Sequence, residues 1–258
     1  HDTAHDGLLK IDVAALVEFN LHDDVMCAAI HTNTPVKKGQ MIAGTRAVPL
    51  VIQRESLDQA KAVLQNGPVF QVKPFKKSKA RLVITGNEVY NGLIKDRFEP
   101  VLTAKMQDLG SEVAAVAFAP DDAGLIRAAI RSHLDRGCDL LLLSGGMSVD
   151  PDDVTRLGIR SAGAGEMHYG SAVLPGAMFL VAYLGDVPLL GVPACGLFHR
   201  ITVLDLVLPR ILAGEIIGKA ELAFFNDTTT TDIYTREDFV NRVRELTEGR
   251  GVAVVYDS

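Results

Sequence analysis

The chain has 258 residues, 48% of them hydrophobic, and a mean hydropathy of +0.18, so it can bury one large or two modest cores and is not a disordered protein. Its 26 basic and 32 acidic residues leave a formal charge of −6, which argues against nucleic acid as a partner because phosphate backbones require concentrated Lys and Arg. Three widely spaced cysteines indicate a reducing cytoplasm, and no apolar run reaches membrane-spanning length.

Residues 1–77 have the pattern of a small α+β domain. The predicted elements are a helix at residues 12–20, strands at 25–30 and 69–72, a strand pair or bent strand at 41–52, and a helix at 56–64. Asp12 is a good helix cap, and Gly44 and Pro49 exclude a regular central strand. The basic run at residues 73–81 is interpreted as a solvated linker, with a patch that steers an anionic ligand as the alternative.

From residue 80 onward, strand patterns alternate with helix patterns. The predicted strands cover residues 81–84, 112–118, 140–143, 177–183 and 187–192, and the predicted helices cover 98–109, 123–136 and 198–212. Strands and helices in this alternation imply a mostly parallel sheet covered on both faces, the α/β fold class. The last two strands are predicted to form a hairpin. We expect this second domain to span residues 78–218, with a linker and tail at 219–258.

Polar, glycine-containing turns follow the predicted strands. They lie at residues 85–88, 121–122, 144–155 and 191–196. Because the carboxyl ends of parallel strands meet at one edge of a sheet, the first three turns are expected to gather there. Ligands bind at this edge in open α/β sheets.

The turn at residues 144–155 contains the largest number of candidate ligand-binding groups. Gly145 and Gly146 permit close approach of a ligand to the backbone, and their free N–H groups suit a phosphate. Its other polar side chains are Ser148, Asp150, Asp152, Asp153 and Thr155. Hydroxyl groups add hydrogen-bond donors, and clustered carboxylates suit a hard cation. The alternative is an ordinary strand-to-helix turn with solvated aspartates.

Four motifs in this half of the chain carry a family resemblance. They are Ile-Thr-Gly-Asn-Glu-Val-Tyr at residues 84–90, Pro-Asp-Asp at 120–122, Ser-Gly-Gly-Met-Ser-Val at 144–149 followed by Asp153, and Leu-Leu-Gly-Val-Pro at 189–193. Over residues 80–214 the chain resembles the molybdopterin-binding domain shared by the MoeA and MogA molybdenum-cofactor proteins and the CinA family. The resemblance implies a three-layer αβα domain that holds a pyranopterin phosphate at the carboxyl edge of its sheet. It also leads us to expect further sequence ahead of His1.

The resemblance assigns roles to individual residues. It implies that the ligand is held by Thr85, Gly86, Asn87, Gly145, Gly146, Ser148, Gly191 and Pro193. Asp153 and Glu88 would be the catalytic carboxylates and would also bind Mg²⁺, which offsets phosphate charge and helps to position molybdate. Cys195 lies in the last turn, where a reactive thiol would need exposure and a lowered pKa.

Three departures from the family pattern bear on activity. Asn87 stands where the insertion enzymes usually carry Asp, which removes one negative charge from a Mg²⁺ site. Residues 150–151, Asp-Pro, replace a glycine-containing step, and the turn at 191–196 lacks the usual Asn and second Pro. Ligand binding survives such changes more readily than catalysis does, because catalysis requires closer placement.

The leading hypothesis is a cytoplasmic molybdopterin-binding protein of molybdenum cofactor biosynthesis or delivery, with molybdopterin molybdotransferase activity left open and a homo-oligomeric state expected. One alternative is a CinA-like hydrolase of nucleotide pyrophosphates, in which Asp152, Asp153 and Glu88 hold a divalent cation. Another is a non-enzymatic interaction module that retains the fold.

The tail at residues 234–258 is predicted to form a helix followed by a strand. It resembles part of the nucleotide-binding domain of zinc-family quinone reductases. No Gly-x-Gly-x-x-Gly fingerprint precedes it, so a dinucleotide site is not supported.

Overall fold

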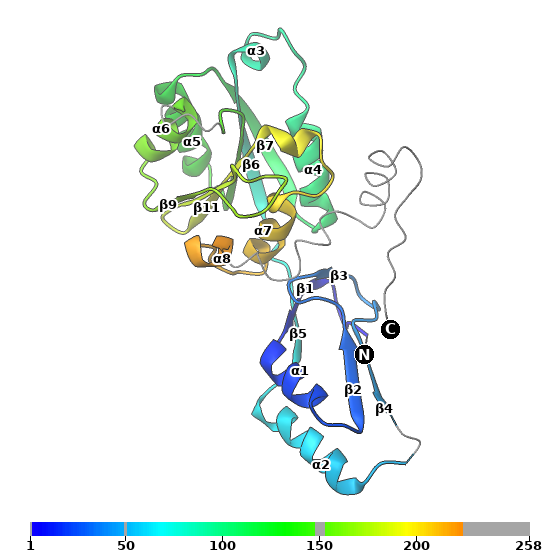
Figure 1. Cartoon of the computed structure of the whole chain (residues 1–258). Helices are drawn as coiled ribbons and strands as arrows, with labels where there is room; N and C mark the ends of the chain where they lie inside the picture. The colour runs from blue at the N-terminus through cyan, green and yellow to red at the C-terminus, as the bar shows by residue number, and fades with distance from the viewer. Residues whose placement is uncertain (1, 49–50, 148–152, 224–258) are drawn as a thin grey trace, which may run out of the picture.

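The computed structural model describes residues 2–48, 51–147 and 153–223 (Figure 1). The predicted site residue Ser148, its neighbours Asp150 and Asp152, and the helix and strand predicted at 234–258 lie outside these ranges.

The N-terminal part of the chain forms a small unit of two sheets and two helices. It consists of β1 (Gly7–Ile11), α1 (Val13–Asn20), β2 (Val25–Ala29), β3 (Pro35–Val36), β4 (Ala43–Ala47), α2 (Arg54–Val63), the 3-10 turn η1 (Leu64–Asn66) and β5 (Phe70–Lys73). One sheet has the order β3-β1-β5 and the other pairs β2 with β4. Asp12 caps α1 as predicted, since its carboxylate accepts a hydrogen bond from the Ala15 N–H at 3.0 Å. The sequence prediction missed β1 and β3.

The second half of the chain is built on a six-stranded sheet. Its strands are β6 (Lys79–Thr85), β7 (Glu112–Ala119), β8 (Leu140–Ser144), β9 (Met167–Tyr169), β10 (Leu180–Leu184) and β11 (Val187–Val192), in the order β7-β6-β8-β11-β10-β9. The pairs β6–β7, β6–β8 and β8–β11 are parallel, whereas β10 is antiparallel to both of its neighbours. The predicted mostly parallel sheet, with its hairpin, is confirmed.

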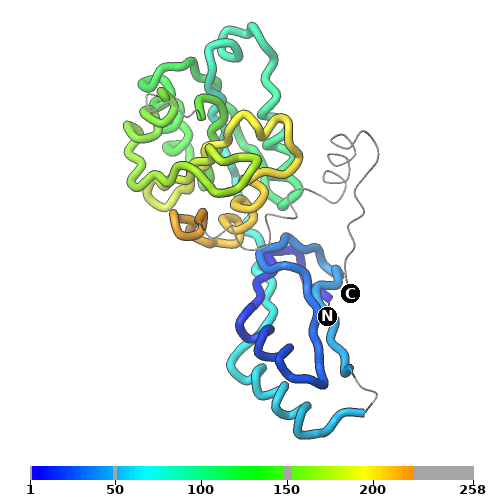
Figure 2. The backbone as a smooth tube through the Cα atoms, in the orientation of Figure 1, coloured from blue at the N-terminus to red at the C-terminus, as the bar shows by residue number. Residues whose placement is uncertain are grey.

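Helices cover both faces of this sheet (Figures 1 and 2). They are α4 (Phe98–Asp108), α7 (Val203–Leu212) and α8 (Lys219–Ala223) on one face, and α5 (Ala123–Asp135) and α6 (Val154–Ser161) on the other, with the short α3 (Asn87–Tyr90) after β6 and the 3-10 turn η2 (Ala194–Leu197) after β11. The three-layer αβα architecture is therefore confirmed. Within the described ranges, no helix combines the length and the apolar character needed to cross a membrane. We call this part of the chain the large unit.

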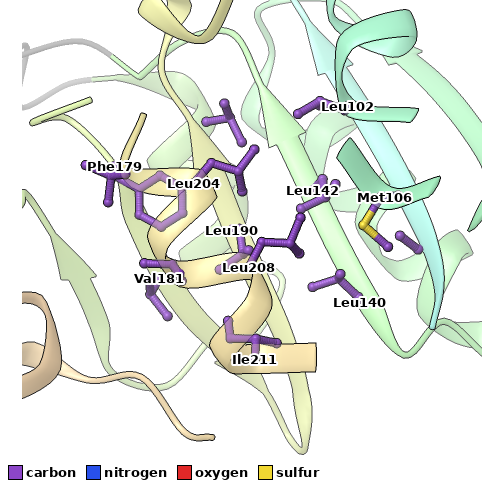
Figure 3. Close-up of a cluster of buried hydrophobic side chains, with 14 of the residues drawn as sticks. Leu102, Met106, Leu140, Leu142, Phe179, Val181, Leu190, Leu204, Leu208 and Ile211 are labelled. Carbon is purple, nitrogen blue, oxygen red and sulfur yellow. The ribbon is translucent and has the colours of Figure 1, made fainter. Parts of the chain in front are cut away.

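The all-leucine strand β8 is explained by burial on both sides. Leu140 and Leu142 belong to the core beneath α4 and α7, while Leu141 and Leu143 belong to the core beneath α5 and α6. Figure 3 shows side chains of α4 and α7 gathered around Leu140 and Leu142. A central strand with two covered faces needs apolar side chains at every position, and not the alternation of a half-exposed strand.

Two sequence predictions in the large unit were wrong. The helix predicted at residues 198–212 begins at Val203 because Thr202 is its cap, with the Thr202 N–H donating to Asp205 Oδ2 at 2.7 Å. The strand predicted at 177–183 begins at Leu180. β9 was missed, because three residues in a glycine-rich passage give no periodic signal.

Candidate functional site

The candidate site lies where the parallel strands of the large sheet end. Thr85, Ala119, Ser144 and Val192 are the last residues of β6, β7, β8 and β11, and the parallel pairing places these four ends at the same edge. In Figure 1 this is the edge near α3, away from the small unit. The predicted convergence of the glycine-containing turns follows from this topology.

A chain of hydrogen bonds links the turns after β6 and β8 to the start of α6. Thr85 Oγ1 donates to the Ser144 carbonyl oxygen at 3.1 Å and lies 3.2 Å from Thr155 Oγ1. The Thr155 N–H donates to Asp153 Oδ1 at 2.9 Å, which makes Asp153 the N-terminal cap of α6. Asp153 is only 7% exposed. A buried carboxylate at a helix N-terminus fits the helix dipole and is held in one orientation.

Both glycines after β8 are required by close packing, against the backbone of β6 at one and against a side chain of α6 at the other. A Cβ on Gly145 would lie 2.2 Å from the Thr85 carbonyl oxygen, and a Cβ on Gly146 would lie 2.1 Å from Thr155 Oγ1. Their φ angles, 87° and 59°, also lie in the left-handed region. The two glycines therefore bring this turn against β6 and α6, and the sequence motif has a structural reason at both positions.

The turn after β6 is fastened to the turn after β7. The Asn87 N–H donates to Asp121 Oδ2, and the Asp121 N–H donates to Asn87 Oδ1, each at 3.1 Å. Gly86 donates its N–H to the Ala119 carbonyl oxygen at 3.2 Å. The Glu88 side chain lies over this turn, with Oε2 3.9 Å from the position of a Cβ on Gly86. Asn87 thus holds the two turns together, a role that an aspartate at this position would also fill. Asp121 is a further acidic residue at this edge of the sheet.

The end of β11 supplies the third side of the edge. A Cβ on Gly191 would lie 2.7 Å from the Met147 methyl carbon, so the glycine makes room for the Met147 side chain. Pro193 precedes η2 in an extended conformation. Ser144, in register with Val192, is fully buried, and its Oγ has no hydrogen-bond partner among the described residues. A buried hydroxyl group of this kind calls for a partner, such as a water molecule or a ligand atom.

Two residues that the sequence reasoning missed stand next to Asp153. The Arg156 guanidinium carbon lies 4.5 Å from the centre of the Tyr169 ring, a cation–π contact between α6 and β9. Burial raises the pKa of the Tyr169 phenol; the positive charge of Arg156 opposes this shift, and the negative charge of Asp153 adds to it. Arg156 follows Asp153 by three residues, which is about one helical turn. This spacing is the sequence signal that could have identified Arg156 as a neighbour of Asp153.

Cys195 lacks the character of a reactive thiol. Burial raises its pKa above the ordinary value, whereas a thiolate nucleophile or sulfur donor needs the opposite shift. Backbone hydrogen bonds within η2 only partly offset the burial.

The described side chains suit an anion-binding turn more clearly than a protein-made metal cage. Glu88 and Asp121 are exposed in the turns after β6 and β7, whereas Asp153 and the hydroxyl groups of Thr85, Ser144 and Thr155 are buried beneath the edge. Within the described ranges no group of three or more His, Cys, Asp or Glu residues is placed to hold a metal ion. A Mg²⁺ ion held by one or two carboxylates together with ligand phosphates needs no such group.

Curated relatives match part of the chain. The CinA-like protein of Mycobacterium tuberculosis is 36% identical over 78 residues, which cover 30% of this chain and 18% of that protein. The CinA-like protein of Mycobacterium leprae is 33% identical over the same length. The chain therefore spans less than a fifth of the length of these relatives.

Several solved structures are similar to the chain. Molybdopterin biosynthesis enzyme MoaB from Thermus thermophilus has a TM-score of 0.45 and 21% identity, covering 54% of this chain and 98% of its own. The molybdopterin biosynthesis MoeA protein from Pyrococcus horikoshii has a TM-score of 0.45 and 23% identity, covering 73% of this chain and 50% of its own. CinA from Thermoplasma acidophilum has a TM-score of 0.46 and 16% identity, covering 53% of this chain and 98% of its own.

A family model described as "Probable molybdopterin binding domain" matches residues 81–213, which is just over half of the chain. The matched residues run from β6 to the end of α7 and contain all the turns described above. The chain belongs to the molybdopterin-binding domain family.

Proposed function

We propose that this protein binds molybdopterin at the carboxyl edge of the large sheet and acts in the biosynthesis or delivery of the molybdenum cofactor. The observation that carries the proposal is the pair Gly145 and Gly146, which pack against the Thr85 carbonyl oxygen and the Thr155 side chain so closely that neither position admits a Cβ. This geometry fixes a turn of the kind that holds phosphate groups through backbone N–H donors. Membership of the family supplies the ligand class.

The proposed contacts are those that the family resemblance implies; Ser148 is among them, although it lies outside the described residues. We propose that Gly145 and Gly146 contact the ligand phosphate or pterin through their backbone. The flanking contacts are assigned to Thr85, Gly86, Asn87, Ser148, Gly191 and Pro193. Asp153 and Glu88 are proposed as the carboxylates that hold a Mg²⁺ ion shared with the ligand phosphate, since Mg²⁺ is commonly bound in this way.

Molybdopterin molybdotransferase activity is the finer form of the proposal. In it the bound Mg²⁺ would supply charge neutralisation between the ligand phosphate and molybdate, both of which are anions. The protein's own part is to hold the two carboxylates in place. Asp153 is fixed by its capping hydrogen bond to Thr155, and Glu88 belongs to a turn braced by Asn87 and Asp121.

The direct test is binding of molybdopterin by the purified chain, measured anaerobically by equilibrium dialysis with and without Mg²⁺. We expect binding by the native protein and weaker Mg²⁺-dependent binding by Asp153→Asn. An asparagine keeps the oxygen that caps α6, so this change removes charge without removing the cap. Failure of the native chain to bind, under conditions in which an established molybdopterin-binding protein does, would remove the proposal.

A matched control is Glu112→Gln. Glu112 is exposed at the start of β7, at the opposite end of the sheet, and the substitution changes the net charge by the same amount. We expect unchanged molybdopterin binding for this variant. Equal weakening by Glu112→Gln and Asp153→Asn would mean a general charge effect and would contradict the assignment of Asp153.

A second candidate function is favoured by the sequence match to the CinA-like proteins. In this alternative the same glycines hold the diphosphate of a nucleotide, and Glu88 and Asp153 help to bind the divalent cation required for hydrolysis. The discriminating measurement is release of AMP from ADP-ribose in the presence of Mg²⁺. Turnover that is lost in Asp153→Asn, together with no molybdopterin binding, would replace the first proposal by this one.

We also propose the domain boundaries and the oligomeric state that the family resemblance implies. The proposed domains are residues 1–77, 78–218 and the tail 219–258, and the proposed state is a homo-oligomer. Light scattering of the purified chain gives its mass directly. A monomer at all accessible concentrations would contradict the proposed assembly.

A further inference from the structure

The small and large units meet at the amino end of the large sheet, opposite the candidate site (Figure 1). β5 continues through a short connection into β6, the first strand of the large sheet. The Lys76 N–H in this connection donates to the Leu212 carbonyl oxygen at the end of α7, at 2.8 Å. The junction therefore forms around the end of α7.

A single carboxylate at this junction faces three cations. Glu215, three residues after α7, has a side chain that is 13% exposed. Its oxygens lie 2.7 Å from Lys10 Nζ, 3.7 Å from Lys73 Nζ and 2.8 Å from Arg210 Nε. Lys10 belongs to β1 and Lys73 to β5, whereas Arg210 belongs to α7. Glu215 is thus the point at which charged groups of both units converge.

The environment of Glu215 keeps it ionised. Burial raises the pKa of its carboxyl group, but hydrogen bonds from Lys10 and Arg210 and their positive charges outweigh burial, so that the net shift is downward. A hydrogen-bonded ion pair with little solvent exposure contributes more than an exposed one, and removal of one partner leaves the others uncompensated.

The small unit also places a cation at the end of another helix of the large unit. Lys37 Nζ donates to the Asp108 carbonyl oxygen, the last of α4, at 3.0 Å. The carboxyl ends of helices carry partial negative charge, which favours nearby cations. The two units therefore make charge-complementary contact at the ends of both α4 and α7. Of these contacts, only the one around Glu215 contains a side chain shared by three cations.

We propose that Glu215 is an electrostatic clasp that fixes the orientation of the small unit on the large unit. With the clasp closed, Lys10 and Lys73 hold β1 and β5 against the end of α7. With the carboxylate removed, the like charges of Lys10, Lys73 and Arg210 repel one another, and the units pivot about the connection at residues 74–78. The candidate site lies at the other edge of the sheet, so ligand binding is not required for the clasp to act.

Trypsin cleavage within the connection at residues 74–78 can report movement between the two units. Lys76 and Lys77 are exposed and are trypsin cleavage sites, and cleavage requires the chain to leave the conformation held by the Lys76–Leu212 hydrogen bond. For Glu215→Gln we expect roughly tenfold faster cleavage after these lysines, the change expected when a charged hydrogen bond is lost. Small-angle X-ray scattering of the full chain should show a larger maximum dimension for the same variant.

Two comparisons make the test decisive. Glu112→Gln has the same change in net charge at the same end of the sheet, and within the described ranges Glu112 forms no ion pair; it should behave as the native chain. Lys10→Met removes the nearer of the two small-unit cations and leaves Lys73 and Arg210 on the carboxylate. It should speed cleavage in the same direction as Glu215→Gln but by less, and it does so without altering the residues that follow α7. In the native chain, 1 M NaCl should move the cleavage rate toward that of the variants.

The proposal is overturned if Glu215→Gln and Lys10→Met, both folded by circular dichroism, retain the native cleavage rate and scattering profile. It is also overturned if Glu112→Gln loosens the junction as much as they do. Neither readout involves molybdopterin, so a negative result for the clasp would not bear on the proposed ligand binding. A negative result for ligand binding would likewise not bear on the clasp.

Discussion

Thr85 Oγ1 lies 3.2 Å from Thr155 Oγ1, although the two threonines are 70 residues apart in the chain. Thr85 ends β6 and Thr155 is the second residue of α6, so this contact ties a central strand to the helix that Asp153 caps. Both side chains are buried, at 4% and 0% exposure. The candidate site thus rests on a buried polar contact between its two main turns.

Replacement of Thr85 by Val should destabilise the fold. The substitution keeps the shape of the side chain but removes its hydrogen bond to the Ser144 carbonyl oxygen, and we expect a loss of about 1–3 kcal/mol in the free energy of unfolding. Urea denaturation measures it. Combined with Thr155→Val, the loss should be smaller than the sum of the two single losses. Strict additivity would mean that the two hydroxyl groups are not coupled.

Addition of a methyl group at Gly146 should cost more than the left-handed backbone alone explains. In Gly146→Ala the new carbon would lie 2.1 Å from Thr155 Oγ1. Gly92→Ala is the control, since Gly92 has a φ of 70° but nothing within 4 Å of a Cβ. We expect about 1–2 kcal/mol for the control, from the left-handed conformation alone, and a larger loss for Gly146→Ala. Thermal unfolding of both variants checks this, and equal losses would contradict the close packing.

The stability of the protein should fall as the pH drops below the ordinary range of histidine. His133 is buried, its Nε2 lies 3.1 Å from the Leu82 carbonyl oxygen, and its pKa is lowered by burial and by the charges of Arg81 and Arg136. Below a pH of about 6.5 the unfolded chain therefore binds a proton that the folded chain resists, which favours unfolding.

The measurement is the free energy of unfolding from urea titrations between about pH 5 and 8, a range that brackets the ordinary pKa of histidine. The native chain should lose stability toward the acid end. In His133→Gln this slope should be reduced, because glutamine keeps a donor for the Leu82 carbonyl oxygen but does not titrate. An identical slope in both proteins would assign the effect to other groups.

Restoration of an aspartate at position 87 should strengthen cation binding. In Asn87→Asp the new carboxylate would keep the hydrogen bond from the Asp121 N–H while standing beside the Asp121 carboxylate. Two adjacent acids attract a hard cation more strongly than one. Calorimetry with Mg²⁺ alone should show a several-fold higher affinity than the native chain. An unchanged affinity would exclude these turns from the proposed Mg²⁺ site.

The sequence was sufficient for features that depend on local pattern and sheet topology. The run Leu140–Leu143 predicts a buried central strand because each face must be apolar, and the gathering of the turns after β6, β7 and β8 follows from parallel order. The cap at Asp12 was also predictable, since it depends on residues close together in the chain.

Features that depend on contacts between distant residues were not predictable. β9 exists because His168 and its neighbours pair with β10, and nothing in the glycine-rich passage marks it. The packing of Arg156 on Tyr169 depends on that strand, and the bracing of Asn87 by Asp121 depends on the pairing of β6 with β7. Each of these required knowledge of which strands are neighbours.

The attachment of the small unit at the amino end of the sheet has a mechanical consequence. A molecule that arrives at or departs from the glycine-rich rim does not have to displace the small unit, because the Lys76–Leu212 hydrogen bond and the contacts around Glu215 lie at the far end of the strands. On the two proposals above, ligand exchange and adjustment of the angle between the units would be separate movements. Protein engineers can alter one without rebuilding the other.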